Sequence, residues 1–263
     1  MIKQVMTALR ISEIPGQDRL ETVVEKIRDQ KLLIVLDNCE HLLRTCAGIA
    51  HKLIGSVPGL SLLVTSREAL NIRGEKIWTI PSLSLPDPSS KINLAIAEKS
   101  EAVNMFADRA RLGKPGFELV EDNAATVVTI CQIVDGIPLA IELVSNRIRH
   151  MAAPTLLRRL SENFDSQTSH DPGTSERHKT IQAAIEWSYN LLSEKEKALF
   201  RQLSVFSGGF DLNAAEVVCT KKILPKEGIL NILSQLVDKS MIQIVYQPGQ
   251  EMRYRLLETL QRF

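Results

Sequence analysis

The sequence predicts an α/β region followed by mostly α-helical regions: a parallel sheet, then a helical domain, then a winged-helix domain. Three observations predict this order. Near the N-terminus, the apolar runs Leu32–Leu36 and Leu60–Thr65 alternate with helical patterns. Amphipathic helical patterns fill the middle of the chain. Several helices followed by a two-stranded hairpin close it, which is the order of a winged helix.

The composition is that of an ordinary soluble globular protein. The 263 residues are 44% hydrophobic and 24% charged. A net charge of +1 gives no overall field that favours nucleic acid or an anionic membrane. No apolar run approaches the ~20 residues that span a bilayer. The four cysteines form no C-x-x-C pair, so we expect free thiols in a reducing cytoplasm.

The first part, residues 1–90, reads as an open α/β sheet. The Leu32–Leu36 run has no polar alternation, which predicts a strand that is buried on both faces. The second strand, Leu60–Thr65, follows a crossover helix, and this βαβ rhythm is typical of a parallel sheet. The expected elements are a helix at Leu20–Arg28, the strand Leu32–Leu36, a helix at Glu40–Leu53, the strand Leu60–Thr65 and a candidate third strand at Ile77–Ile80.

The second part, residues 91–165, is predicted to be a helical domain. Asp135-Gly136 is a C-terminal stop signal, and Pro138 suits the first turn of the next helix. The expected helices are residues 95–111, 122–134, 139–151 and 154–160.

Residues 166–176 are rich in Pro, Gly and Ser and are predicted to be a linker. Residues 177–263 then form the expected winged-helix domain, with Trp187 and Phe206 in its core. Its expected elements are helices at 179–191, 194–203, 211–218 and 228–238, and a hairpin of 241–246 and 252–257 around a turn at 247–250.

Polar residues follow both apolar strands of the first part. Ligands of an open parallel sheet lie beyond the carboxyl ends of its strands. Asp37 at that edge suits Mg²⁺ bound through water, and Arg67 suits a γ-phosphate. Two plainer alternatives stay open: any buried strand can end in Asp, and Arg67 can be a surface arginine paired with a carboxylate.

Several motifs occur in an order that resembles a known family. Leu36-Asp37-Asn38-Cys39-Glu40-His41 comes first, then Thr65-Ser66-Arg67-Glu68, then the segment Gly136–Leu143. Together they resemble the bacterial STAND regulators, relatives of the NB-ARC ATPases. The resemblance continues through 187–193, 203–210, 236–240 and 254–259, so it covers nearly the whole chain.

The resemblance implies an incomplete P-loop NTPase and a set of site residues. Asp37 would hold Mg²⁺ and Glu40 would be the nearest substitute base. Thr65 and Arg67 would contact ATP or ADP, with Gly136 and Pro138 near the adenine. In intact relatives, bound ADP holds the parts closed and ATP opens them.

One part of the family pattern is absent: the chain has no G-x-x-x-x-G-K-[ST] loop, which cradles phosphates. The family places that loop before the counterpart of Met1. We therefore expect a chain truncated before the P-loop, with weak or no nucleotide binding and no ATP hydrolysis.

The missing P-loop strand carries an expectation about the sheet. In the family it lies between the counterparts of Leu60–Thr65 and Ile77–Ile80. Without it, an apolar strand edge is left unpaired, which favours association. We therefore expect residues 1–90 to be loose or self-associating, unless the two flanking strands close up and pair directly.

Two functions remain in view. The first is the C-terminal part of a nucleotide-dependent switch, from a transcriptional regulator. The alternative is a DNA-binding winged-helix regulator that uses no nucleotide. The helix at 228–238 carries no Lys or Arg, so we expect no direct DNA binding. The expected partners are other parts of the same protein, a second copy or an upstream P-loop segment, and no membrane.

Overall fold

The computed structural model describes residues 1–87, 89–166, 176–219, 225–245, 251–261 and 263. The chain divides into two compact units, which are Met1–Ile80 and Pro81–Phe263. We call them the first and second unit and describe each by itself. No helix in the described part of the chain is long and apolar enough to cross a bilayer.

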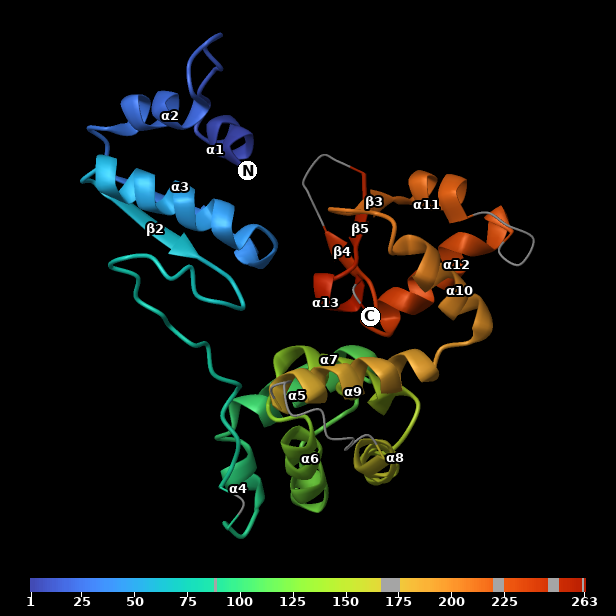
Figure 1. Cartoon of the computed structure of the whole chain (residues 1–263). Helices are drawn as coiled ribbons and strands as arrows, with labels where there is room; N and C mark the ends of the chain where they lie inside the picture. The colour runs from blue at the N-terminus through green and yellow to red at the C-terminus, as the bar shows by residue number, and fades with distance from the viewer. Residues whose placement is uncertain (88, 167–175, 220–224, 246–250, 262) are drawn as a thin grey trace. The chain divides into compact units, whose positions relative to one another are not determined.

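The first unit contains the expected two parallel strands and the helix between them. Figure 1 shows this helix, α3, beside β2. The strands pair in register from Leu32 opposite Leu60 to Leu36 opposite Val64. The crossover helix begins later than predicted because a 3-10 turn precedes it. The elements are α1 (Ile2–Ala8), α2 (Arg19–Ile27), β1 (Leu32–Leu36), η1 (Cys39–Leu42), α3 (Leu43–Ser56) and β2 (Leu60–Val64).

Helix α2 shows why this segment folds locally. The Asp18 carboxylate accepts hydrogen bonds from the backbone amides of Leu20 and Glu21, and so caps the helix. Val23 and Ile27 lie one turn apart and are both buried. They join a core with α3 and the inward side chains of the sheet.

The prediction that β1 is buried on both faces is wrong. Ile34 and Leu36 are buried, whereas Leu33 is 63% exposed and Val35 is 55% exposed. On the neighbouring strand, Leu63 is 54% exposed on the same face. The reason is that the core of this unit, built with α2 and α3, covers one face of the sheet only. The apolar run therefore leaves Leu33 and Val35 on a face that no described element of this unit covers.

The candidate third strand, Ile77–Ile80, is also wrong. This segment is not a strand, and Ile77 and Trp78 are 71% and 86% exposed. Among the described strands, β2 pairs with β1 alone, so the flanking strands do not close up. The looseness or self-association of residues 1–90 stays a prediction.

The second unit contains the predicted helices with shifted bounds. The expected helix at 95–111 is two helices because Ser100 caps a new one, its hydroxyl accepting from the Val103 amide. Most of the expected linker, residues 167–175, lies outside the described residues. The elements are α4 (Leu94–Ala97), α5 (Glu101–Gly113), α6 (Glu121–Ile133), α7 (Pro138–Ser145), η2 (Asn146–Arg149), α8 (Ala153–Ser166), α9 (Glu176–Asn190), α10 (Glu194–Leu203), β3 (Phe210–Asp211), α11 (Leu212–Cys219), α12 (Lys226–Asp238), β4 (Gln243–Val245), β5 (Arg253–Arg255) and α13 (Glu258–Gln261).

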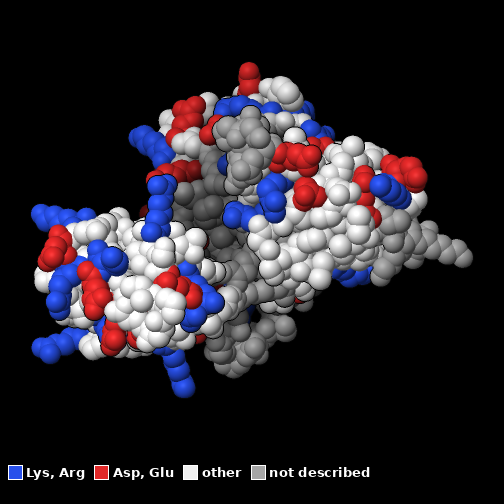
Figure 2. All heavy atoms as spheres, turned by 90° about the horizontal axis from the view of Figure 1, so that it is seen from above, with Lys and Arg blue, Asp and Glu red and all other residues white. Residues whose placement is uncertain are grey.

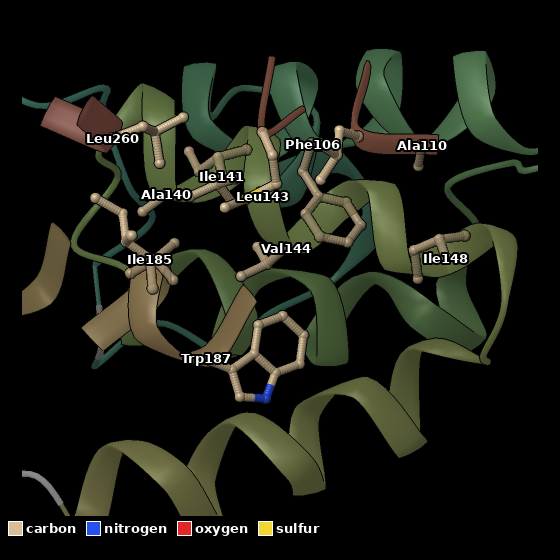
Figure 3. Packing of buried hydrophobic residues seen from close by; sticks show 14 of the residues in the cluster. Phe106, Ala110, Ala140, Ile141, Leu143, Val144, Ile148, Ile185, Trp187 and Leu260 are labelled. Carbon is tan, nitrogen blue, oxygen red and sulfur yellow. The ribbon is translucent and has the colours of Figure 1, made fainter. Parts of the chain in front are cut away.

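One continuous apolar core runs through the second unit, from the middle helices to the C-terminal ones. Figure 3 shows Trp187 of α9 below Val144 and Ile148, on the side of α7 and η2. Trp187 was expected in the core of the winged helix, and the structure places it against the preceding helices as well. Leu260 of α13 belongs to the same cluster. The helical and winged-helix parts are therefore packed together.

The winged-helix part contains the predicted hairpin and one further strand. Strands β4 and β5 pair antiparallel, while the expected turn at 247–250 lies outside the described residues. The two-residue strand β3 adds to the other edge of β5, giving the order β3-β5-β4. Phe210 of β3 stacks on Tyr254 of β5 with ring centres 5.8 Å apart. A strand this short leaves no periodic signal in a sequence.

Candidate functional site

The carboxyl edge of the two-stranded sheet brings the first predicted site residues together. The Thr65 hydroxyl donates to the Asp37 carboxylate at 2.5 Å and accepts from the Asn38 amide at 2.9 Å. The Cys39 amide donates to the Thr65 carbonyl at 3.0 Å. Asn38 takes a left-handed conformation with φ 61°, which turns the chain away from β1. Asp37 and Thr65 are both exposed, and each directly follows one of the two strands.

Glu40 and Arg67 lie at the same edge and bind one another. Arg67 Nε lies 3.1 Å from Glu40 Oε1, with side-chain exposures of 39% and 11%. Glu40 is in the first turn of η1. This pair matches the alternative of a surface arginine neutralised by a carboxylate. The pairing occupies Glu40, whereas the Asp37 carboxylate is exposed at the edge.

The donor set at this edge is small for a metal ion. The described residues contain no group of three or more His, Cys, Asp and Glu side chains that fit a metal. Asp37 and the Thr65 hydroxyl would suit Mg²⁺ only if waters or phosphates completed the shell. Two hollows of about 620 and 560 Å³ exist in this unit, and neither includes Asp37 or Thr65.

Replacing Thr65 with valine tests the coupling of the two strand ends. We expect the variant to lower the free energy of unfolding of the first unit by about 1–2 kcal/mol, because the Asn38 amide loses its acceptor. Faster hydrogen exchange of the β1 and β2 amides would report it. Ser61→Ala, at an exposed position within β2, is the matched control and should leave exchange unchanged. Equal exchange in the Thr65 variant and wild type would contradict the coupling.

Gly136 and Pro138, the other predicted site residues, have clear structural tasks. Gly136 ends the turn after α6 with φ 63°, and a Cβ there would lie 2.4 Å from the Leu83 carbonyl oxygen. Pro138 is exposed and occupies the first turn of α7, where its missing amide costs nothing. Both sequence signals for a helix stop and a helix start are confirmed. A nucleotide role for either residue stays a prediction.

Helix α12 occupies the place of the recognition helix in a winged-helix domain. Its outward face is mostly uncharged: Leu230 is 49% exposed, and Asn231, Ser234 and Gln235 are exposed. Its one cation, Lys226, lies 3.3 Å from Glu216 of α11. A face of α12 whose one cation is paired is poor for phosphate contacts. Figure 2 shows one side of the whole chain, on which acidic and basic side chains are interspersed.

The C-terminal end of α12 is held by charged and polar contacts with the preceding helices. Asp238 pairs with Arg149 of η2 at 3.0 Å. Just beyond the helix, Ser240 donates to Glu142 of α7 at 3.1 Å, and Asn146 donates to the Ser240 hydroxyl at 2.5 Å. These contacts fix one end of α12 within the second unit.

Glu196, which the sequence analysis did not single out, is the centre of a buried polar cluster. Its carboxylate accepts from Lys239 and from the Ser193 amide and hydroxyl. Burial by itself raises the pKa of Glu196, but these hydrogen bonds outweigh it and hold the pKa below 4.5. Burial lowers the pKa of the nearby Arg147, and the charge of Glu196 opposes that shift. The Ser193-x-x-Glu196 spacing of a capping box was the available signal.

The structure and its matches agree on the class: the C-terminal part is a winged-helix domain. Residues 192–263 match the family described as "Winged helix-turn-helix domain". Domains of this kind typically bind DNA, whereas the uncharged helix at 228–238 predicts no direct DNA binding.

Curated relatives match nearly the whole chain. The "Putative HTH-type transcriptional regulator Rv0890c" of Mycobacterium tuberculosis is 40% identical over 256 residues, 97% of this chain and 27% of that protein. "Uncharacterized protein Rv0894" of the same organism is 35% identical over 260 residues, 98% of this chain and 63% of that protein. The chain thus spans about a quarter of the regulator and less than two thirds of the other relative.

A more distant match is the "Disease resistance protein TAO1" of Arabidopsis thaliana, 25% identical over 220 residues, which cover 84% of this chain and 16% of that protein. These matches show a winged-helix domain and relatives that include a putative HTH-type transcriptional regulator. A P-loop NTPase fold is not shown by the two-stranded sheet.

Proposed function

We propose that this chain is a segment of a transcriptional regulator and that its winged helix contacts other parts of the same protein rather than DNA. The observation that carries the second part is the face of α12, whose one cation is already paired with Glu216. The 40% identity with an HTH-type regulator along nearly the whole chain supports the first part. We divide the chain into three parts, residues 1–90, 91–165 and 177–263, with a linker at 166–176. We propose that the protein is located in the cytoplasm.

Direct DNA binding by the winged helix is the second candidate, and the family match favours it. Arg255 is exposed on β5, so the wing offers a cation where winged helices often touch a phosphate. In this case α12 would enter the major groove with Asn231 and Gln235, both exposed and suited to adenine.

A gel-shift experiment with the whole chain separates these two candidates. We expect no sequence-selective complex at low salt, and only weak retention that disappears as salt rises. A selective complex that is lost in Gln235→Ala and kept in Ser204→Ala, an exposed position outside α12, would overturn the proposal and support the second candidate.

We further propose that the regulator is a nucleotide-dependent switch. The resemblance to STAND regulators and the distant match to a disease resistance protein support it. In that form Asp37 holds Mg²⁺ and Glu40 serves as base. Thr65 and Arg67 contact the phosphates of ATP or ADP. Gly136 and Pro138 shape the adenine side.

The chain itself is expected to bind nucleotide weakly or not at all, because it has no phosphate-cradling loop. Isothermal titration with Mg-ATP and with Mg-ADP measures this directly. A micromolar dissociation constant would contradict it and would reveal a phosphate site of another kind.

A further inference from the structure

A methionine beside the hairpin of the winged-helix part contacts a buried tyrosine. Met252 directly precedes β5, and the hydroxyl of Tyr254 in that strand donates to the Met252 thioether sulfur at 3.4 Å. Met252 is 52% exposed, whereas Tyr254 is 6% exposed and its ring stacks on Phe210. The packing of the tyrosine ring therefore fixes a hydroxyl donor next to a sulfur atom in a solvent-exposed side chain.

Met252 differs from the other methionines in its access to solvent. The chain has six methionines, all of them in the described part, and Met252 alone is exposed. Met6 and Met241 are 2% and 0% exposed. A dissolved oxidant must reach the sulfur atom to react with it, so oxidation follows exposure. Peroxide should therefore react at Met252 before it reacts at the buried methionines.

We propose that Met252 is a site of reversible oxidation to methionine sulfoxide and that Tyr254 binds the product. A lone pair of the sulfur attacks one oxygen of hydrogen peroxide, so that a sulfur–oxygen bond forms and the oxygen–oxygen bond breaks. The other oxygen leaves as water with both hydrogen atoms; the sulfur is oxidised and the peroxide is reduced. A methionine sulfoxide reductase reverses the change, consuming a pair of thiols and releasing a disulfide and water.

The Tyr254 hydroxyl gives the oxidised side chain a partner. A thioether sulfur is a weak acceptor, whereas oxidation adds a polar oxygen atom. The methionine side chain has three rotatable bonds, which let it bring that oxygen to the tyrosine hydroxyl. Oxidation then strengthens the link between Met252 and β5, the middle strand of its sheet.

Oxidation also changes the surface of the hairpin. Ile244 of β4 lies directly opposite Tyr254 and is 45% exposed. Met252 and Ile244 are therefore diagonal neighbours on one face of the hairpin, because residues two apart in an extended segment point the same way. A sulfoxide replaces half of this apolar pair by a polar group. The site does not depend on the proposed role in transcription.

Mild treatment with hydrogen peroxide, followed by mass spectrometry of peptides, locates the modified residue. We expect Met252 to be oxidised at least about tenfold faster than Met6 and Met241, because only its sulfur is open to solvent. Hydrogen exchange of the β4 and β5 amides then measures the part of Tyr254. We expect exchange about threefold slower in the oxidised than in the reduced wild type, as one stronger hydrogen bond gives. Treatment with sulfoxide reductase should restore the original rate.

Three variants separate the tyrosine contact from other effects of peroxide. Tyr254→Phe keeps the ring that stacks on Phe210 and removes the hydroxyl, so oxidation should no longer slow exchange. Met252→Leu is the matched control for oxidation elsewhere in the chain, and peroxide should leave its exchange unchanged. Met252→Gln supplies an amide oxygen as acceptor and should slow exchange without peroxide. The glutamine variant keeps the test decisive if Tyr254→Phe fails to fold.

Equal oxidation rates at Met252 and the buried methionines would overturn the modification site. Unchanged or faster exchange in the oxidised wild type would overturn the role of Tyr254. The same conclusion would follow if oxidation slowed exchange equally in wild type and in Tyr254→Phe.

Discussion

Replacing Gly136 with valine is expected to lower the free energy of unfolding of the second unit by about 3 kcal/mol or more. Two causes act together. The backbone there has φ 63°, which a β-branched residue rarely adopts. A Cβ would also come within 2.4 Å of the Leu83 carbonyl oxygen. The backbone has little room to yield, because the Leu83 amide donates to the Gly136 carbonyl at 3.0 Å.

Thermal unfolding followed by the fluorescence of Trp187, which is buried in the core of the same unit, measures this loss. Trp78 is replaced by phenylalanine in all chains so that one tryptophan reports. Gly228→Ala is the matched control: this glycine is in α12, its φ is not positive, and the nearest atom to an added Cβ is 3.8 Å away. The control should be neutral or slightly more stable. Equal losses in the two variants would show that Gly136 has no special constraint.

Replacing Glu196 with alanine is expected to lower the free energy of unfolding of the second unit by about 3–5 kcal/mol. This is the usual penalty for removing one member of a buried charged group. The carboxylate is 2% exposed, and its loss leaves Lys239 and the buried Arg147 without their acidic neighbour. Arg147 then keeps the Ser188 carbonyl and the face of Trp187. Glu194→Ala, on the same helix with an 83% exposed side chain, should change stability by no more than about 0.5 kcal/mol.

The same cluster predicts how stability depends on pH. The pKa of Glu196 is lower in the folded chain than its ordinary value of 4.5. Its contribution is therefore complete above that value and is lost as the pH falls through the folded pKa. Urea unfolding at several acid pH values should show a smaller loss of stability for the alanine variant than for wild type. Parallel pH profiles would contradict the assignment.

The sequence by itself determined much of the local structure. Helices α5 to α12, the strands β1, β2, β4 and β5, and the turn at Gly136 followed by Pro138 were expected from periodicity, caps and stop signals. These features depend on neighbours within a few residues, which a single sequence contains. It also placed Asp37 and Thr65 at one sheet edge, because parallel strands end at the same side.

Only the tertiary structure decided which surfaces are covered. The apolar run of β1 reads as buried on both faces, yet Leu33 and Val35 are exposed, because covering is supplied by other elements. Residues Ile77–Ile80 do not form a strand. A strand needs a neighbouring strand to accept and donate its backbone hydrogen bonds, and no local pattern reveals whether one is present.

Long-range pairing of polar groups was equally invisible. Arg67 forms an ion pair with Glu40, Asp238 with Arg149, and Lys239 with Glu196. The partners are far apart in the sequence, and no rule of local spacing relates them. These pairs decide whether a charge at a strand end or on α12 is available to a ligand. The sequence therefore determined which residue types lie near the candidate site. The packing determined which of their charges can bind a ligand, because a charged side chain is neutralised by an opposite charge that the fold places within about 4 Å.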